Sequence, residues 1–353
     1  MLKINSLVSR LGIMLLAASA ATAQVRQASA DEAADFYRGK AVTLLVGYSA
    51  GGGYDIYART IARYMGDHMP GAPKIVIQNM PGAGSISSAN YLYGVAVKDG
   101  SIFGTFGRGV PMEPLIGIAK TQYDATKFTW IGSAADELSV CAVTQKSGIK
   151  TFEDLLKRDV AVGGEGSGSD PDTYAMMVRG ILGARLKLVT GYPGGNDMTL
   201  AIERGEIDGR CGWSWGSIKA TRPEWASGPN RLNILMVMSS ARHEELHDIP
   251  AVIEKAKNER ERQIINLIVS RQTIARPFAA PPAIPAARRD ALRKGFDATM
   301  KDPRYIAEAK SLSLDVAPVT GSEIEKLIQT LYATPKDVVE QTRAVIAAGS
   351  KAD

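Results

Sequence analysis

One local pattern recurs along the sequence and limits what the chain can fold into: a short apolar segment, a glycine-rich turn, and then an amphipathic segment. It is clearest at 42–53, VTLLVGYSAGGG, and glycine-rich turns open further segments at 82–84 and 163–168. Alternating strands and helices predict mostly parallel sheets with helices on both faces. Each turn leaves backbone amides unpaired at the positive end of a helix dipole, which favours binding of an anion.

The rest of the chain extends this pattern into two α/β units, as a length of 353 residues also indicates. We expect further strands at 74–80, 101–107, 186–192 and 232–240, and, after 275–285, helices near 286–300, 303–311, 322–331 and 335–348. In an open α/β sheet, ligands lie beyond the carboxyl ends of the strands. The glycine-rich turns lie there, so they are the candidate ligand site.

The first residues have the pattern of an export signal. Lys3 and Arg10 give a basic start, 11–21 is a short apolar core, and residues 21–23 form a small-residue cleavage site. We predict a signal peptide over 1–23, with cleavage after residue 30 as the alternative and a buried N-terminal helix as the competing interpretation. The mature protein should be soluble and exported, because no other uncharged run is long enough to span a bilayer.

Charge and cysteine content exclude several classes of function. The formal net charge is +5, and the basic residues are scattered among acids, so nucleic acid is not an expected partner. Cys141 and Cys211 are too few for a metal cluster, and their spacing matches no zinc motif. In an oxidising compartment they either form a disulfide or remain two buried thiols. We predict no metal and no cofactor.

Ser49 lies in a G-x-S-x-G turn between a strand and a helix, the context of a serine-hydrolase nucleophile. A hydrolase also needs a histidine that a carboxylate orients, and the chain has three histidines. His68 falls about 20–25 Å along the helix that Ser49 opens. No earlier strand-to-helix turn exists to supply an oxyanion loop. We therefore interpret the turn as a ligand cradle and keep an exported serine hydrolase as the alternative.

Two further motifs are set aside. His243 and His247 frame a literal H-E-x-x-H, but Pro250 follows closely and no helix precedes it, so the helical context of a zinc protease is missing. The loop 163–168, GGEGSG, lacks the lysine of a phosphate-binding loop and a nearby acidic residue for a ribose. Neither zinc nor a nucleotide is expected.

Several segments, in order, resemble the substrate-binding proteins of tripartite tricarboxylate transporters, the Bug or TctC-like family. The resemblance extends over about residues 36 to 345. The matching segments are FYRGKAVTLLVGYSAGGGYDIYARTIARYM, VIQNMPGAGS, VKDGSIFGTFG, VGGEGSGSDPDTYAMMV, GYPGGNDMTLAIERGEIDG and MVMSSARHEELHDIPAVIE. The last segment explains the H-E-x-x-H motif as an ordinary loop.

The resemblance implies a two-lobed periplasmic-binding-protein fold of type II-like architecture. Each lobe is expected to be a mostly parallel α/β sheet flanked by helices, with the ligand cleft between the lobes and two chain crossings. Lobe 1 would comprise 36–133 and 241–353, and lobe 2 would comprise 134–240. The resemblance also implies a monomer in the periplasm.

The function implied by the resemblance is that of an extracytoplasmic receptor. It would capture a small organic carboxylate, such as a di- or tricarboxylate, an aromatic acid or an amino acid, and deliver it to a membrane permease. Contacts to both lobes would form only on hinge closure, so the ligand would shift the population to the closed form. A sensor or scavenger without a permease is the other alternative to the hydrolase.

The family binds a carboxylate mainly through backbone amides and waters from two opposing loops, which correspond here to 48–55 and 164–170. In this scheme the Ser49 hydroxyl and two glycine amides donate to the anion, and Asp55 anchors the helix start. The expected ligand-binding residues are Tyr48, Ser49, Gly51, Gly52, Asp55, Arg108, Gly166, Ser167, Gly168, Ser169, Tyr192 and Trp213.

Some residues depart from the family pattern or have two interpretations. Arg108 directly follows a strand, so it either points into the cleft to bind a second carboxylate or is a solvated arginine. Trp213 and Trp215 are either platforms for the ligand or core residues. Glu165 stands where the family has a small polar residue. It would repel a carboxylate unless it points to solvent or binds an amine.

Overall fold

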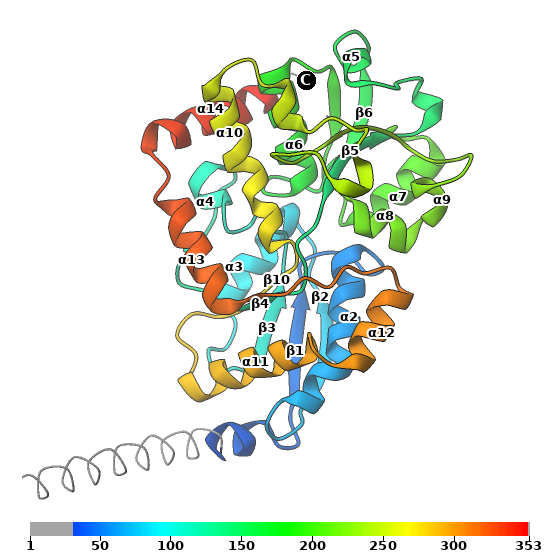
Figure 1. Ribbon diagram of the computed structural model, residues 1–353. Helices are drawn as coiled ribbons and strands as arrows, with labels where there is room; N and C mark the ends of the chain where they lie inside the picture. The colour runs from blue at the N-terminus through cyan, green and yellow to red at the C-terminus, as the bar shows by residue number, and fades with distance from the viewer. Residues whose placement is uncertain (1–30, 352–353) are drawn as a thin grey trace, which may run out of the picture.

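The computed structural model describes residues 31–351, so the predicted signal peptide lies outside the described residues. Two β-sheets, each flanked by helices, lie at opposite ends of the molecule (Figure 1). The predicted two-sheet α/β fold is therefore confirmed. Among the described residues, no helix is both long and apolar enough to cross a bilayer.

The first sheet has six strands in the order β11-β4-β10-β3-β1-β2. Their bounds are β1 (Ala41–Val46), β2 (Lys74–Asn79), β3 (Ile102–Thr105), β4 (Thr129–Ser133), β10 (Pro277–Ala280) and β11 (Val319–Thr320). Strands β2 and β3 pair parallel to β1, whereas β10 pairs antiparallel to both β3 and β4, and β11 antiparallel to β4.

The second sheet has five strands in the order β7-β6-β8-β5-β9. Their bounds are β5 (Ser139–Val143), β6 (Val160–Gly163), β7 (Leu186–Val189), β8 (Gly209–Ser214) and β9 (Asn233–Val237). Strand β6 runs parallel to β7 and β8, and β5 runs antiparallel to β8 and β9. Both sheets are thus mixed rather than mostly parallel, because the strands before and after the passages between the sheets (β4, β5, β9 and β10) pair antiparallel to their neighbours.

Helices cover both sheets, as the alternating pattern requires. Their bounds are α2 (Gly53–Met65), α3 (Ile86–Gly94), α4 (Glu113–Ile116), α5 (Phe152–Leu155), α6 (Asp170–Leu182), α7 (Gly195–Arg204), α8 (Trp215–Thr221), α9 (Pro223–Ala226), α10 (Glu259–Val269), α11 (Ala286–Thr299), α12 (Pro303–Ser311), α13 (Gly321–Tyr332) and α14 (Lys336–Ser350). Local residues determine both ends of helix α6. At its N-terminus the Ser169 side chain accepts a hydrogen bond from the Asp172 amide, and at its C-terminus Gly183 adopts the left-handed conformation that ends the helix.

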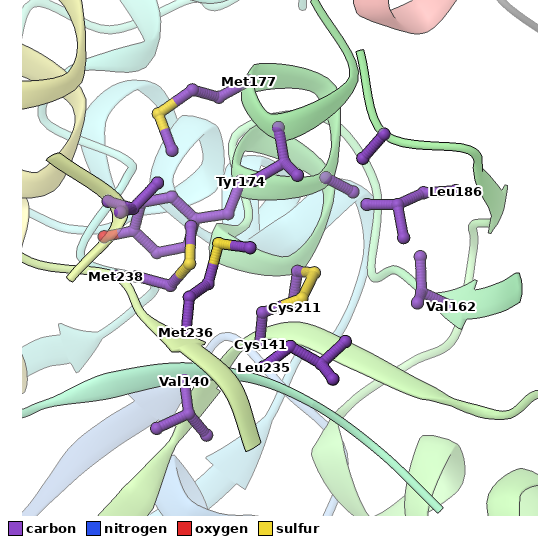
Figure 2. Close-up of a cluster of buried hydrophobic side chains, with 14 of the residues drawn as sticks. Val140, Cys141, Val162, Tyr174, Met177, Leu186, Cys211, Leu235, Met236 and Met238 are labelled. Atoms are coloured by element: carbon purple, nitrogen blue, oxygen red, sulfur yellow. A yellow bond between two sulfur atoms is a disulfide. The ribbon is translucent and has the colours of Figure 1, made fainter. Parts of the chain in front are cut away.

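The core of the second unit surrounds a disulfide. Cys141 of β5 lies opposite Cys211 of β8, and their sulfur atoms are bonded. Both residues are fully buried in a cluster that includes Tyr174, Met177 and Met236 (Figure 2). The bond joins two strands of one sheet that are 70 residues apart in sequence.

Three segments of the chain pass between the two units, one more than the resemblance implies. They are 134–138, 270–276 and 333–335, which leads from α13 to α14. Helix α14 packs on α6, and apolar residues of both α10 and α14 belong to the core of the second unit. The predicted division into 36–133 plus 241–353 and 134–240 stays a prediction, and this packing would move α10 and α14 into lobe 2.

Candidate functional site

A pocket of about 50 Å³ lies where the two units face each other. On the first unit, its walls are the turn before α2 and the residues after β3. On the second unit, they are the starts of α6, α7 and α8 and the end of β8. A water molecule needs roughly 10–15 Å³ of such space, so the pocket takes a small molecule of a few non-hydrogen atoms.

Two helix N-termini meet at the pocket without a side-chain cap. Helices α2 and α7 begin after Gly52 and Gly194, and neither glycine can accept a hydrogen bond through a side chain. A β-carbon built on Gly52 would lie 3.6 Å from the backbone nitrogens of Gly195 and Asn196. The first amides of a helix have no acceptor within the helix and carry the positive end of its dipole. The facing starts of α2 and α7 therefore favour an anion between them.

Arg210 of β8 and Glu165 after β6 add one charge of each sign to the pocket wall. The Arg210 Nη2 atom donates to Glu165 Oε1 at 3.1 Å, and the two residues are 8% and 6% exposed. Among the described residues, the Arg210 Nε atom finds no hydrogen-bond partner. A β-carbon on Gly195 would lie 3.1 Å from Arg210 Nη1, so the guanidinium reaches the start of α7. Arg210 can thus bind the same anion as these amides.

The environment of Glu165 perturbs its titration. Burial raises the pKa of Glu165 to about 7, and the carboxylates of Asp172 and Asp170 add to the rise. The Arg210 guanidinium and a hydrogen bond from Tyr48 oppose it. The charge of this pocket carboxyl therefore changes near neutral pH.

Arg108 lines the pocket, but ion pairs and hydrogen bonds engage its guanidinium. It pairs with Asp170 at the start of α6 and donates to Ser139 Oγ at 2.6 Å and to the Glu137 carbonyl oxygen at 3.4 Å. Arg271 also reaches Asp170, at 3.3 Å. Arg108 is therefore not solvated, and its Nε, Nη1 and Nη2 atoms already donate to the protein. The structure offers little support for a second carboxylate at this arginine.

A second buried arginine, Arg276, supports the floor of the pocket. Its Nη2 atom donates to Glu137 Oε1 at 2.6 Å and to Ser217 Oγ at 2.9 Å. Its guanidinium also lies 4.4 Å from the ring centroid of Tyr54. Glu137 and Arg276 belong to the segments that pass between the units. These ion pairs therefore connect the pocket to the hinge region.

Aromatic rings form the apolar part of the wall. Tyr48 and Tyr54 stack with their ring centroids 4.7 Å apart. Trp213 also lines the pocket and packs edge-on against Trp225 at 5.6 Å, so it serves both the wall and the core. Trp215 does not line this pocket, and its indole N–H donates to Glu245 Oε2 at 3.0 Å.

The loop 164–170 is held by its own helix. Asp172 Oδ2 accepts the amides of Glu165 and Gly166 at 2.7 and 3.0 Å, and also the Ser169 hydroxyl at 2.7 Å. The glycine-rich turn 82–84 of the first unit packs against this loop, because the Gly84 amide donates a hydrogen bond to the Glu165 carbonyl oxygen. Two donors expected from this loop are thus already bonded within the protein.

The first predicted loop is also partly self-bonded. The Ser49 hydroxyl donates to Asp197 Oδ2 at 2.5 Å, which attaches the turn to α7. The Gly51 amide donates to Asp55 Oδ2 at 2.9 Å, so Asp55 anchors the turn as expected. Of the twelve predicted ligand-binding residues, the structure brings five to the pocket: Tyr48, Gly51, Gly52, Arg108 and Trp213. The others lie outside its lining: Ser49, Asp55, Gly166, Ser167, Gly168, Ser169 and Tyr192.

Sequence reasoning missed Arg210, Arg276 and the start of α7. The sequence contains a weak signal for each arginine, because Arg210 lies in a short apolar strand and Arg276 lies directly before one. A charged side chain at such a position is expected to be buried, and a buried charge needs a partner of opposite sign. The pairing itself depends on residues far away in sequence, Glu165 and Glu137.

The histidines that a serine hydrolase or a zinc protease would need have other surroundings in the structure. His68 Nε2 contacts Asp302 at 2.8 Å, and His243 Nδ1 accepts the Glu245 amide, so neither is a partner of Ser49. Residues 244–246 form a single short 3-10 turn rather than the helix of a zinc protease. Within residues 31–351, no group of three or more metal-ligating side chains is placed to hold an ion.

Sequence comparison finds a distant curated relative. The chain is 25% identical over 288 residues to a UPF0065 protein in the TAR-I ttuE-ttuC' intergenic region of Agrobacterium vitis. The match spans 80% of this chain and 77% of the relative. No family model matches the chain.

Solved structures share the fold over most of the chain. The periplasmic binding protein BugD superposes with a TM-score of 0.70 at 19% identity, over 89% of this chain and 99% of that one. R. palustris Rpa4515 with adipate gives 0.67 at 18% identity, over 86% and 97%. MatC from Rhodopseudomonas palustris with bound malate gives 0.65 at 17%, over 87% and 99%. The resemblance drawn from the sequence motifs is thereby confirmed at the level of the fold.

Proposed function

We propose that this chain, which has the fold of the Bug- and TctC-type periplasmic solute-binding proteins, is a receptor for a small organic carboxylate. One observation carries the proposal: the uncapped starts of α2 and α7 face each other at a pocket that Arg210 also lines. Amides, two helix dipoles and a guanidinium all favour a carboxylate there. The adipate and malate named for two proteins of the same fold are ligands of this chemistry.

Closure of the two units provides the mechanism. The α2 start belongs to one unit, whereas α7 and Arg210 belong to the other, so a ligand contacts all of them only in the closed form. Ser49–Asp197 and Arg108–Asp170 are contacts across the same cleft. A ligand that adds contacts to both sides shifts the equilibrium towards the closed form. In this scheme a partner protein recognises and binds the closed form.

We further propose that the protein works in the periplasm as a monomer and delivers its ligand to a tripartite tricarboxylate-type permease. The support is the kind of protein that shares the fold, which includes a periplasmic transporter and a TctC solute-binding protein. A permease gene pair beside this gene would support transport, whereas its absence would favour a sensor or scavenger.

A thermal-shift panel of mono-, di- and tricarboxylates with uncharged controls tests the receptor proposal. A ligand at 100 times its Kd stabilises the protein by about 2.7 kcal/mol, which raises the melting midpoint by several degrees. We expect at least one carboxylate to shift the wild type and Arg210→Gln to lose most of that shift. An exposed arginine outside the pocket, Arg204, gives the matched control Arg204→Gln. A panel without any shift, on protein that was unfolded and refolded to remove carried-over ligand, would contradict the proposal.

A further inference from the structure

Strand β8 contains one residue more than its pairing with β5 requires. Trp213 lies opposite Val140. Cys211 lies opposite Cys141, so a single step along β5 is matched by two steps along β8. The extra residue is Gly212, which has a φ of 77°, in the left-handed region that favours glycine. This arrangement is a β-bulge, which changes the direction of the side chains that follow it.

The bulge decides which side chains of β8 reach the pocket. Side chains of a regular strand alternate between the two faces of a sheet, so residues three apart point to opposite faces. Arg210 and Trp213 are three apart, yet both line the pocket, and the Arg210 Cζ atom lies 5.7 Å from a ring centroid of Trp213. The extra residue therefore places a cation and an aromatic ring on the same wall.

The disulfide fixes where along β8 the bulge lies. Figure 2 shows Val140 and the disulfide on opposite sides of their strand. The bond holds Cys211 on the core side with Cys141, so the neighbouring Arg210 points to the other side, towards the pocket. Without the bond, the extra residue can move along β8. With residue 210 as the extra one, Cys211 would lie opposite Ala142, and Arg210 would leave its place on the pocket wall.

The bulge is also packed tightly against the start of α6. A β-carbon on Gly212 would lie 2.6 Å from Tyr174 Cδ2 and 2.8 Å from the backbone carbonyl of Asp170. Tyr174 belongs to the same buried cluster as the disulfide, and Asp170 pairs with Arg108 and Arg271. The bulge thus lies between the disulfide core and a second part of the pocket wall, so a displacement of the bulge would disturb both.

We propose that the Cys141–Cys211 bond positions the ligand site: it holds the bulge at Gly212 and keeps Arg210 on the pocket wall, so that its loss weakens ligand binding in protein that is still folded. This inference rests on the proposed function. Both cysteines are fully buried and lie outside the pocket lining, so they act through their neighbours in the strands and are positioning residues.

Binding measured on folded protein separates positioning from general stabilisation. The probes are malate and adipate, titrated calorimetrically into wild type and Cys141→Ala/Cys211→Ala at a temperature at which circular dichroism shows both fully folded. We expect the Kd of the variant to be about tenfold higher, as for the loss of one hydrogen bond to a charged group. The matched control is Leu155→Ala, which shortens a fully buried side chain of α5 in the same core. It should lower the melting midpoint and leave the Kd unchanged.

A second readout needs no ligand. The Arg210 guanidinium lowers the pKa of Glu165, against the effects of burial and of the Asp170 and Asp172 carboxylates. If Arg210 moves away in Cys141→Ala/Cys211→Ala, the pKa of Glu165 should rise above its wild-type value, as followed by NMR of a labelled side-chain carboxyl. Leu155→Ala should keep the wild-type pKa, because a lower stability alone does not displace Arg210.

Gly212→Ala tests the bulge with the bond intact. Its β-carbon would collide with Tyr174 and Asp170, so it should raise both the Kd and the pKa of Glu165. A folded Gly212→Ala protein that is unchanged in both quantities would contradict the role of the bulge. If Cys141→Ala/Cys211→Ala does not fold, Cys141→Val/Cys211→Ala replaces it, because valine restores part of the lost volume.

The outcomes separate this inference from the function on which it rests. An unchanged Kd and an unchanged pKa of Glu165 in the folded cysteine variant would overturn the positioning role, while the carboxylate receptor would stand. If neither malate nor adipate binds the wild type, the pKa of Glu165 in the variants still decides the positioning role, and the wider carboxylate panel decides the receptor.

Discussion

Glu165 makes the stability of the protein depend on pH in a direction opposite to that of most carboxylates. Its pKa in the folded protein is about 7, whereas a glutamate in the unfolded chain has a pKa of about 4.3. The folded state therefore holds a proton that the unfolded state releases between these two values. Stability from this group is fully present below about pH 4.3 and is lost as the pH rises through about 7.

The magnitude follows from the gap between the two pKa values. Each pKa unit corresponds to 1.36 kcal/mol, so the gap of about 2.7 amounts to about 4 kcal/mol on complete ionisation. Glu165→Gln imitates the neutral carboxyl and removes this loss. We expect the variant to gain on the wild type by up to about 3 kcal/mol as the pH rises from 4.5 to 8.

Urea denaturation of both proteins at half-unit pH steps, without ligand, measures this difference. The difference in the free energy of unfolding should be smallest at pH 4.5 and level off above pH 8. The surface variant Glu340→Gln should follow the wild type throughout. Parallel curves for wild type and Glu165→Gln across this range would refute the buried, raised-pKa account of Glu165.

Three further predictions concern other parts of the site and core. Gly84→Ala should lower the melting midpoint, because Gly84 has a φ of 60° and its new β-carbon would lie 2.7 Å from a backbone nitrogen of the facing loop. Gly94→Ala, where a β-carbon meets nothing within 4 Å, is its control, and an equal effect of both would contradict the close approach. Thiol titration of the denatured, unreduced protein should find no free thiol, and two titratable thiols would contradict the Cys141–Cys211 bond. Reduction of this disulfide should lower the free energy of unfolding by up to about 4 kcal/mol. Ser49→Ala should leave any rate of ester hydrolysis unchanged. Loss of that activity in the variant would favour the serine-hydrolase interpretation instead.

Local patterns sufficed for most of the fold. Helix α12 coincides with the predicted 303–311, and α2 begins at the glycine-rich turn as its periodicity requires. These elements are determined by caps, glycines and apolar spacing, which lie close together in the sequence. The mixed direction of the sheets was not predicted, because the pairing of β4 with β10 joins residues about 150 apart and has no local signal.

The site was harder to predict than the fold for the same reason. The sequence identified the turn at 48–55, because glycines before a helix mark an anion site by themselves. It could not tell that Asp172 and Asp55 occupy several of the amides in the two expected loops. It also could not pair Arg210 with Glu165, which lie on different segments of the second sheet. Which donors remain available depends on tertiary contacts.

A crystal structure grown with the carboxylate that shifts the melting midpoint most tests the central claim directly. The account predicts that the ligand lies between the starts of α2 and α7, with its carboxylate within hydrogen-bond distance of Arg210 and of amides at the N-termini of these two helices. A ligand bound outside this pocket, or one whose carboxylate makes no contact with either helix start, would contradict it.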